Sequence, residues 1–161
     1  MKELFIRDGQ KWNRFVIRVD RDLKIKDLLI DELNFSVRSI SKMKRDKNIY
    51  KNGQPTKPTS MAKPGDIIEI EINEEKAGFE GQDLGIAIVY EDQDLIVADK
   101  PPFMVVHPTK SHFDGTLANA ITYHIGRTGE DCRIRFVNRL DMNTSGLVVI
   151  AKNSYAHHKL C

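Results

Sequence analysis

The sequence contains little cysteine and no long hydrophobic run. Its 161 residues include only two cysteines, Cys132 and Cys161, whose isolation excludes a disulfide framework and the spacing of zinc ligands. No apolar stretch approaches the roughly 18 residues that a membrane-spanning helix needs. The first residues, MKELFIRDGQ, lack the apolar core of a signal peptide. We therefore expect a cytoplasmic protein with no metal and no membrane anchor, and a monomer, because no oligomerisation signal is present.

Positive charge is concentrated in one segment, although the formal net charge is only +2. Residues 36–63 contain a single acid, Asp46. The same segment holds eight bases: Arg38, Lys42, Lys44, Arg45, Lys47, Lys51, Lys57 and Lys63. A local excess of lysine and arginine is typical of surfaces that bind the phosphates of nucleic acids. The alternative is a solvated face that only keeps the protein soluble.

Residues 1–73 show the periodicities of a small α+β domain. ELFIRD and FVIRV alternate as strands do, whereas residues 25–33 place apolar side chains at helical spacing. Ser36 is a suitable N-cap for a second helix over VRSISKMKRD, which would turn its bases outward. Asn52-Gly53 predicts a hairpin turn, and residues 67–72 form an alternating strand.

A change of composition after residue 73 predicts a linker over residues 74–83 and a second domain over residues 84–161. The predicted strands are AIVYED, DLIVADKPP, FMVVHP, IRFVNRLD and GLVVIAK, with a helix over GTLANAITYHI. We interpret KPP as a strand-ending turn, with a catalytic lysine as the alternative. A last helix barely begins at NSYAHHKL, so we expect the chain to be part of a longer protein. The overall pattern predicts the α+β class.

The basic segment resembles the alpha-L RNA-binding domain of a ribosomal protein. The likeness covers about residues 14–73 and rests on SVRSISKMKR, IYKNG and AKPGDIIEI. It implies RNA contact through the bases of the second helix and the hairpin, namely Arg38, Lys42, Lys44, Arg45, Lys47 and Lys51. Two positions depart from the family pattern: Lys47 stands where glycine is common, and Val37 where arginine is often found.

The stretch FVNRLDMNTSGLVVIAKN places charged residues in front of an apolar strand. Asp141 could act as a nucleophile or as a general acid or base, and Arg139 could keep its carboxylate ionised. Thr144 and Ser145 offer hydrogen-bond donors to a substrate. The alternative is a structural ion pair beside a strand turn.

Three ordered motifs in the second half resemble the RluA-type pseudouridine synthases. RLDMNTSGLVVIAK is similar to their signature H-R-L-D-x-x-T-S-G-L-L-x-x-A-K. YEDQDLIVADKPPFMVVHP is similar to Y-E-D-x-x-L-x-V-x-(N/D)-K-P-x-G-x-x-V-H-P, and GTLANAI to T-L-x-N-A-L. The resemblance implies the first part of a mixed, mainly antiparallel sheet domain. It also implies isomerisation of a flipped uridine in rRNA or tRNA, without cofactor or metal.

The same resemblance assigns roles to individual residues. It implies that Asp141 is the catalytic aspartate and that Arg139 fills the gap left in the RNA. Thr144 and Ser145 border the substrate, and Asn138 stands where the family usually has histidine. A later tyrosine and a later basic residue of the family pocket have no counterpart within these 161 residues. An RNA-binding fragment without catalytic activity is therefore the alternative.

Overall fold

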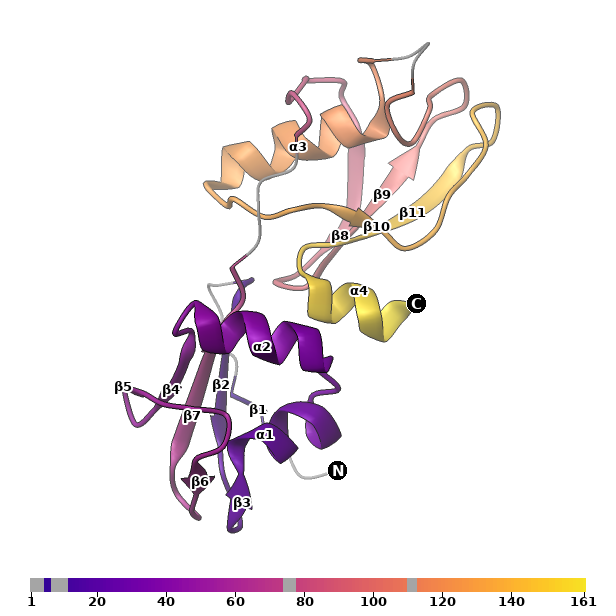
Figure 1. Cartoon of the computed structure of the whole chain (residues 1–161). Coiled ribbons are helices and arrows are strands. Elements are labelled where there is room, and N and C mark those ends of the chain that lie inside the picture. Colours follow the sequence, from indigo (N-terminus) through magenta and orange to yellow (C-terminus); the bar gives the residue numbers. More distant parts are fainter. Residues whose placement is uncertain (1–4, 7–11, 74–77, 110–112) are drawn as a thin grey trace. The chain divides into compact units, whose positions relative to one another are not determined.

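The computed structural model describes residues 5–6, 12–73, 78–109 and 113–161, and the chain divides into two compact units (Figure 1). Unit 1 is Met1–Asn73 and unit 2 is Glu74–Cys161. Each unit combines helices with antiparallel strands, which confirms the predicted α+β class. Within the described ranges, no helix has the length and apolarity to cross a membrane.

Unit 1 contains one five-stranded sheet, one two-stranded sheet and three helical segments. The strands are β1 (Phe5–Ile6), β2 (Arg14–Arg18), β3 (Leu23–Lys24), β4 (Ile49–Lys51), β5 (Gln54–Pro55), β6 (Met61–Ala62) and β7 (Ile67–Glu71). The helical segments are α1 (Ile25–Asp27), η1 (Leu28–Glu32) and α2 (Val37–Arg45). The larger sheet has the order β1-β2-β7-β4-β5, and β3 pairs with β6.

A continuous apolar core holds α2 in unit 1. Phe15 is fully buried on β2, and its ring meets that of Phe35 edge to face at 5.8 Å. The helix predicted over residues 25–33 instead begins as one α-turn and continues as the π-helix η1, which still buries Leu28 and Leu29. Ile40 and Met43 are the buried residues of α2, so its charged residues face outward.

Local sequence accounts for the two ends of the basic segment. The Ser36 hydroxyl accepts a hydrogen bond from the Ser39 N–H at 3.1 Å, which confirms the predicted cap of α2. Between β4 and β5, Asn52 and Gly53 have φ values of 51° and 77°, as a type I′ hairpin turn requires. The Asn52 side chain also accepts a hydrogen bond from the Ile67 N–H at 2.8 Å, which ties this turn to β7.

Unit 2 consists of a four-stranded antiparallel sheet and two helices. The strands are β8 (Ala87–Glu91), β9 (Leu95–Lys100), β10 (Arg135–Phe136) and β11 (Gly146–Ala151), and the helices are α3 (Leu117–Thr128) and α4 (Ser154–Leu160). The strand order is β10-β11-β9-β8. The strand predicted at FMVVHP is wrong, because β9 ends at Lys100 and residues 101–108 form turns and bends. Pro101 and Pro102 have no N–H to donate to a sheet, and Phe103 has a φ of 64°.

Helix α3 fixes the segments before it. A capping box between Thr116 and Asn119 begins the helix. The first two N–H groups of α3 donate to the carbonyl oxygens of Val105 and Val106, at 2.9 and 3.0 Å. The Asn119 amide donates to the Glu80 carbonyl at 2.8 Å. Part of the predicted linker is therefore held against α3 inside unit 2.

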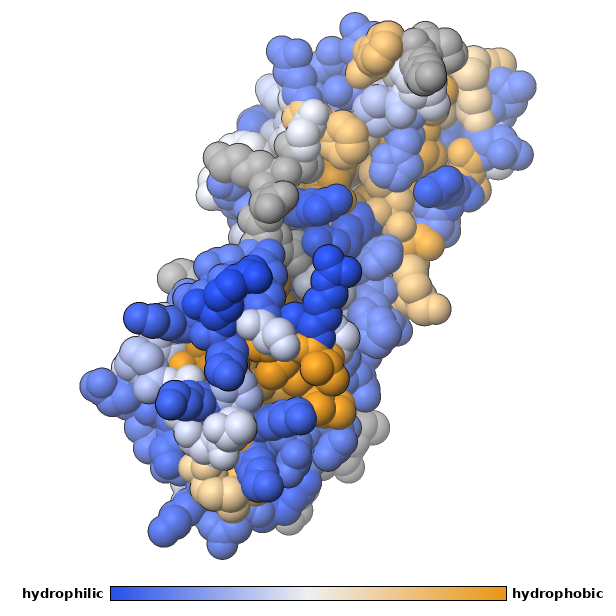
Figure 2. Space-filling model, viewed as in Figure 1, coloured by the Kyte–Doolittle hydropathy of each residue, from blue (hydrophilic) through white to orange (hydrophobic). Residues whose placement is uncertain are grey.

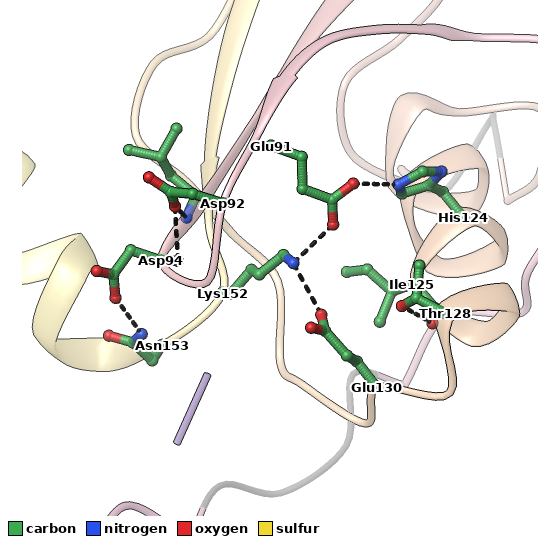
Figure 3. A network of polar contacts seen from close by, with 10 residues as sticks. Glu91, Asp92, Asp94, His124, Ile125, Thr128, Glu130, Lys152 and Asn153 are labelled. Carbon is green, nitrogen blue, oxygen red and sulfur yellow. Dashed lines mark hydrogen bonds and ion pairs between the residues drawn. The ribbon is translucent and has the colours of Figure 1, made fainter. Parts of the chain in front are cut away.

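An ionic network around the buried Lys152 joins α3 to one end of the sheet (Figure 3). The Lys152 ammonium is 2.6 Å from a Glu91 oxygen and 2.8 Å from a Glu130 oxygen, and its side chain is 3% exposed. His124 of α3 contacts the other Glu91 oxygen at 2.6 Å. Burial lowers the pKa of Lys152, but the two carboxylates outweigh it and raise that pKa overall. The network therefore stabilises the charged lysine.

Candidate active site

Asp141 lies in the loop over residues 137–145, which connects β10 to β11 at the end of the sheet opposite the ionic network. The Thr144 N–H donates to the Asp141 carbonyl oxygen at 3.1 Å and closes a turn. The Asp141 side chain is exposed, so its carboxylate is accessible to a ligand. Gly146 ends the loop with a φ of 140°, a conformation that side-chain-bearing residues rarely adopt.

Asn138 fastens the first half of this loop to β11. Its side-chain oxygen accepts a hydrogen bond from the Val149 N–H at 2.8 Å, and its amide donates to the Leu147 carbonyl at 3.1 Å. The preceding Val137 N–H donates to the Val149 carbonyl at 2.9 Å. The Asn138 side chain thus takes the place of a backbone partner and prolongs the β10–β11 pairing towards Asp141.

Lys100 fastens the other side of the loop. Its side chain is fully buried, and the ammonium donates to the carbonyl oxygens of Pro101, Met104 and Met142, at 3.0, 2.8 and 3.2 Å. One cation therefore joins the loop after β9 to the Asp141 loop, and Figure 1 shows both loops at the same end of the sheet. Burial lowers the pKa of Lys100, and the negative charge of Asp141 opposes that shift.

This role of Lys100 extends the interpretation of KPP as a strand-ending turn. The residue ends β9 as expected, but its contact with Met142 joins positions 42 residues apart in the sequence. A lysine at the end of an apolar strand, directly before two prolines, was the only local signal of burial. This local sequence does not identify the carbonyl groups that the Lys100 ammonium binds.

Arg139 is exposed beside His107 and forms no ion pair with Asp141 in the described structure. Burial lowers the pKa of His107, and the positive charge of Arg139 lowers it further. The His107 ring meets the Phe136 ring edge to face at 4.5 Å. Thr144 and Ser145 are exposed, and their side chains form no hydrogen bond with other described residues. Their hydroxyl groups are therefore available to a ligand.

The arrangement combines an accessible carboxylate with a rigid backbone and nearby positive charge. Asn138 and Lys100 hold the loop from two sides, which fixes the position of Asp141. Such a carboxylate can act as a nucleophile or accept a proton. The described residues contain no cluster of three histidine, cysteine, aspartate or glutamate side chains that could hold a metal ion.

The four bases of α2 that are predicted to contact RNA fall into two groups. Arg38 and Lys44 are exposed on α2 and have no ion pair with any described residue. Lys42 donates to the Asn73 carbonyl at 2.9 Å, and Arg45 pairs with Asp46 at 3.2 Å. Hydrophilic residues surround a compact hydrophobic area on the visible face of this unit (Figure 2).

Two further bases predicted to contact RNA lie near the hairpin. Lys51 is 3.2 Å from Asp66 and also donates to the Met61 carbonyl, so part of its charge is compensated. The Asp66 pKa is lowered to about 2, first by the Lys63 N–H and then by Asn52 and Lys51. Lys47 is exposed and has a φ of 56°, the left-handed region that favours glycine.

Known proteins resemble the chain over both units. A family model described as RNA pseudouridylate synthase matches residues 94–161, which include the Asp141 loop. The ribosomal large subunit pseudouridine synthase D of Pseudomonas aeruginosa is 39% identical over 117 residues, which cover 72% of this chain and 37% of that protein. The protein of the same name from Vibrio parahaemolyticus is 37% identical over 157 residues, or 96% of this chain and 46% of that protein.

A third relative, an uncharacterized RNA pseudouridine synthase of Aquifex aeolicus, is 37% identical over 132 residues. These residues cover 79% of this chain and 42% of that protein. The chain thus spans less than half the length of the curated relatives it matches.

Proposed function

Since the chain belongs to the RNA pseudouridine synthases of the RluA type, we propose that it isomerises uridine to pseudouridine in RNA, with Asp141 as the reacting carboxylate. The observation that carries the proposal is the exposed Asp141 on a loop fastened by Asn138 and Lys100. A flipped nucleotide needs a fixed carboxylate that it can reach, and this loop provides one.

The reaction conserves every atom of the substrate apart from exchanged protons. Asp141 attacks the ribose or the uracil and forms a covalent bond with it, and the bond between N1 of uracil and C1′ of ribose breaks. The freed base rotates and C5 of uracil forms the new bond to C1′. The bond to Asp141 then breaks and restores the carboxylate, while the C5 proton is released and N1 gains a proton. In this scheme Arg139 occupies the gap that the flipped nucleotide leaves, while Thr144 and Ser145 border the substrate.

Unit 1 provides the RNA contact in this proposal. Arg38 and Lys44 are exposed on α2 and form no ion pair with the described residues, so they can neutralise phosphates. Lys42, Arg45, Lys47 and Lys51 lie in the same segment and add to its positive charge. The names of the relatives from Pseudomonas aeruginosa and Vibrio parahaemolyticus favour ribosomal RNA of the large subunit over transfer RNA as the substrate.

Release of tritium from RNA labelled at C5 of uracil tests the proposal. Large-subunit ribosomal RNA is incubated with the 161-residue chain, with Asp141→Asn and with Asp114→Asn, a control at another exposed aspartate of unit 2. We expect release by the chain and by Asp114→Asn, and none by Asp141→Asn, whose RNA affinity stays near that of the unchanged chain. Release by Asp141→Asn at the normal rate would exclude the role of this aspartate.

A second candidate function is RNA binding without catalysis, which the unpaired Arg38 and Lys44 favour. It predicts that the 161-residue chain binds the same RNA with a strong dependence on salt. It also predicts that no tritium is released by any variant. Tritium release that depends on Asp141 would exclude this candidate.

A further inference from the structure

Phe103 is an exposed aromatic residue in a strained backbone conformation. Its φ is 64° and its surface is 74% exposed. The other described residues with a positive φ, glycine excepted, are Asn34, Lys47 and Asn52. Asparagine adopts left-handed φ values several-fold more often than most residues, whereas a bulky apolar side chain there is an outlier. Unit 2 therefore bears two costs at Phe103, backbone strain and an apolar ring in water, and such strain concentrates at ligand-binding sites.

The backbone on both sides of Phe103 is held in place. The Lys100 ammonium binds the carbonyl groups of Pro101 and Met104, and the first N–H groups of α3 bind those of Val105 and Val106. The exposed ring is thus carried by a fixed loop. A fixed aromatic ring loses little conformational entropy when it binds a flat partner.

The same lysine joins the loop of Phe103 to the loop of Asp141. Phe103 precedes Met104 and Asp141 precedes Met142, and the carbonyl groups of both methionines bind the Lys100 ammonium, at 2.8 and 3.2 Å. Met142 is itself 41% exposed. Phe103 and Asp141 therefore each lie one residue from a carbonyl group that binds the same ammonium, and both residues are exposed.

We infer that Phe103 is a base-stacking residue that binds an unpaired nucleobase next to the uridine held at Asp141. The inference rests on the proposed function. A flipped nucleotide leaves its neighbours without a stacking partner, and an aromatic ring offers one to any base. Phe103 stands where the similar motif K-P-x-G has glycine. The aromatic ring is therefore a feature of this chain that the motif does not contain.

Two substitutions separate the ring from the strain. Phe103→Asn removes the ring and tolerates the positive φ, so we expect the fold of unit 2 to remain at least as stable. Phe103→Tyr keeps an aromatic ring in the same backbone. Phe113→Asn is the matched control, because Phe113 is 75% exposed in the same unit and has no positive φ.

The experiment measures the dissociation constant of each intact variant for a stem–loop RNA with a uridine-rich single-stranded loop. Loss of one base–aromatic stack weakens binding about 5-fold or more. We expect this loss for Phe103→Asn, and unchanged affinity for Phe103→Tyr and Phe113→Asn. If Phe103→Asn binds RNA as tightly as the unchanged chain, the stacking role of Phe103 is overturned while the proposed function stands. The same holds if Phe113→Asn loses as much RNA affinity as Phe103→Asn. Failure of the unchanged chain to bind RNA would instead contradict the proposed function, and the inference with it.

Discussion

At the scale of single residues, the geometry of the Asp141 loop depends on Lys100. Its ammonium donates hydrogen bonds to three carbonyl groups, which take the place of water. The three carbonyl groups belong to two separate loops. Hydrogen bonds from a charged donor contribute about 1.5–3 kcal/mol each, and a buried carbonyl left without a donor costs about 1–3 kcal/mol. Removal of this charge therefore affects both the stability of unit 2 and the position of Asp141.

We expect Lys100→Met to lower the free energy of unfolding of unit 2 by about 2–3 kcal/mol, because three carbonyl groups lose their charged donor. It should also slow tritium release under conditions in which the variant is still folded, since Met142 is no longer held. Urea unfolding followed by circular dichroism checks the first effect. The control is Lys159→Met, at an exposed lysine of α4, and equal unfolding curves for the two variants would contradict the prediction.

Lys47 offers a residue-scale test of backbone strain. A residue other than glycine pays about 1–2 kcal/mol for its left-handed conformation, partly offset by the greater freedom of glycine in the unfolded chain. We therefore expect Lys47→Gly to raise the free energy of unfolding of unit 1 by about 0.5–1 kcal/mol. Lys44→Gly, inside α2, should lower it by about 1 kcal/mol. Denaturant unfolding of both variants shows whether each substitution raises or lowers the free energy of unfolding. A lower value for Lys47→Gly would contradict the prediction.

At the scale of secondary-structure elements, the Lys152 network connects α3 with the ends of β8 and β11. Burial raises the pKa of Glu91, but its hydrogen bonds with Lys152 and His124 outweigh burial and lower that pKa overall. A lowered carboxyl pKa contributes stability above the ordinary value of 4.5, and this contribution is lost as pH falls through the folded-state pKa. The raised pKa of Lys152 matters at high pH, because its contribution to the stability of unit 2 is lost as pH rises beyond 10.5.

We expect Lys152→Met to destabilise unit 2 by about 3 kcal/mol at neutral pH, because Glu91 and Glu130 then lose the ammonium that joins them. Glu91→Gln should destabilise it less, and its difference from the unchanged chain should shrink as pH falls below the ordinary carboxyl pKa of 4.5. Free energies of unfolding measured across this pH range check both statements. A difference that stays constant down to pH 3 would show that the Glu91 charge contributes nothing.

Elements whose cause is local were predictable from the sequence. Ser36 caps α2 and Asn52-Gly53 turns the hairpin because each acts on atoms within a few positions of itself. The π-helix η1 and the irregular backbone at FMVVHP were not predicted, because apolar spacing and runs of Val and Ile do not specify them. The turn that carries Asp141 was predicted from one stretch, and the role of Asp141 stays a prediction. The contact between Lys100 and Met142 depends on residues far apart in the chain.

At the scale of the whole molecule, charge is distributed unequally between the two units. The formal net charge of +2 conceals the basic segment of unit 1, in which Arg38 and Lys44 have no ion pair with any described residue. Each lysine or arginine that neutralises a phosphate releases counterions, so it contributes to the salt dependence of binding. Arg38 and Lys44, which are both exposed on α2, should therefore contribute to this dependence.

We expect Arg38→Gln and Lys44→Gln each to reduce the slope of log affinity against log salt by about 0.7–0.9. Arg21→Gln is the control, because Arg21 is paired with Glu32 and lies outside the basic segment. RNA affinity measured at several salt concentrations gives the slopes. An identical slope for all three variants would exclude phosphate contact by α2.

The separate cores of the two units give the chain an optical and a chemical reporter. Trp12, the only tryptophan in the sequence, is buried in unit 1, so the indole emission follows the unfolding of that unit. The thiol of Cys132 is buried in unit 2, whereas the thiol of Cys161 is exposed and reacts with an alkylating reagent at once. The slow phase of alkylation therefore measures how often unit 2 opens. The stability of each unit can thus be followed in the intact chain without an added label.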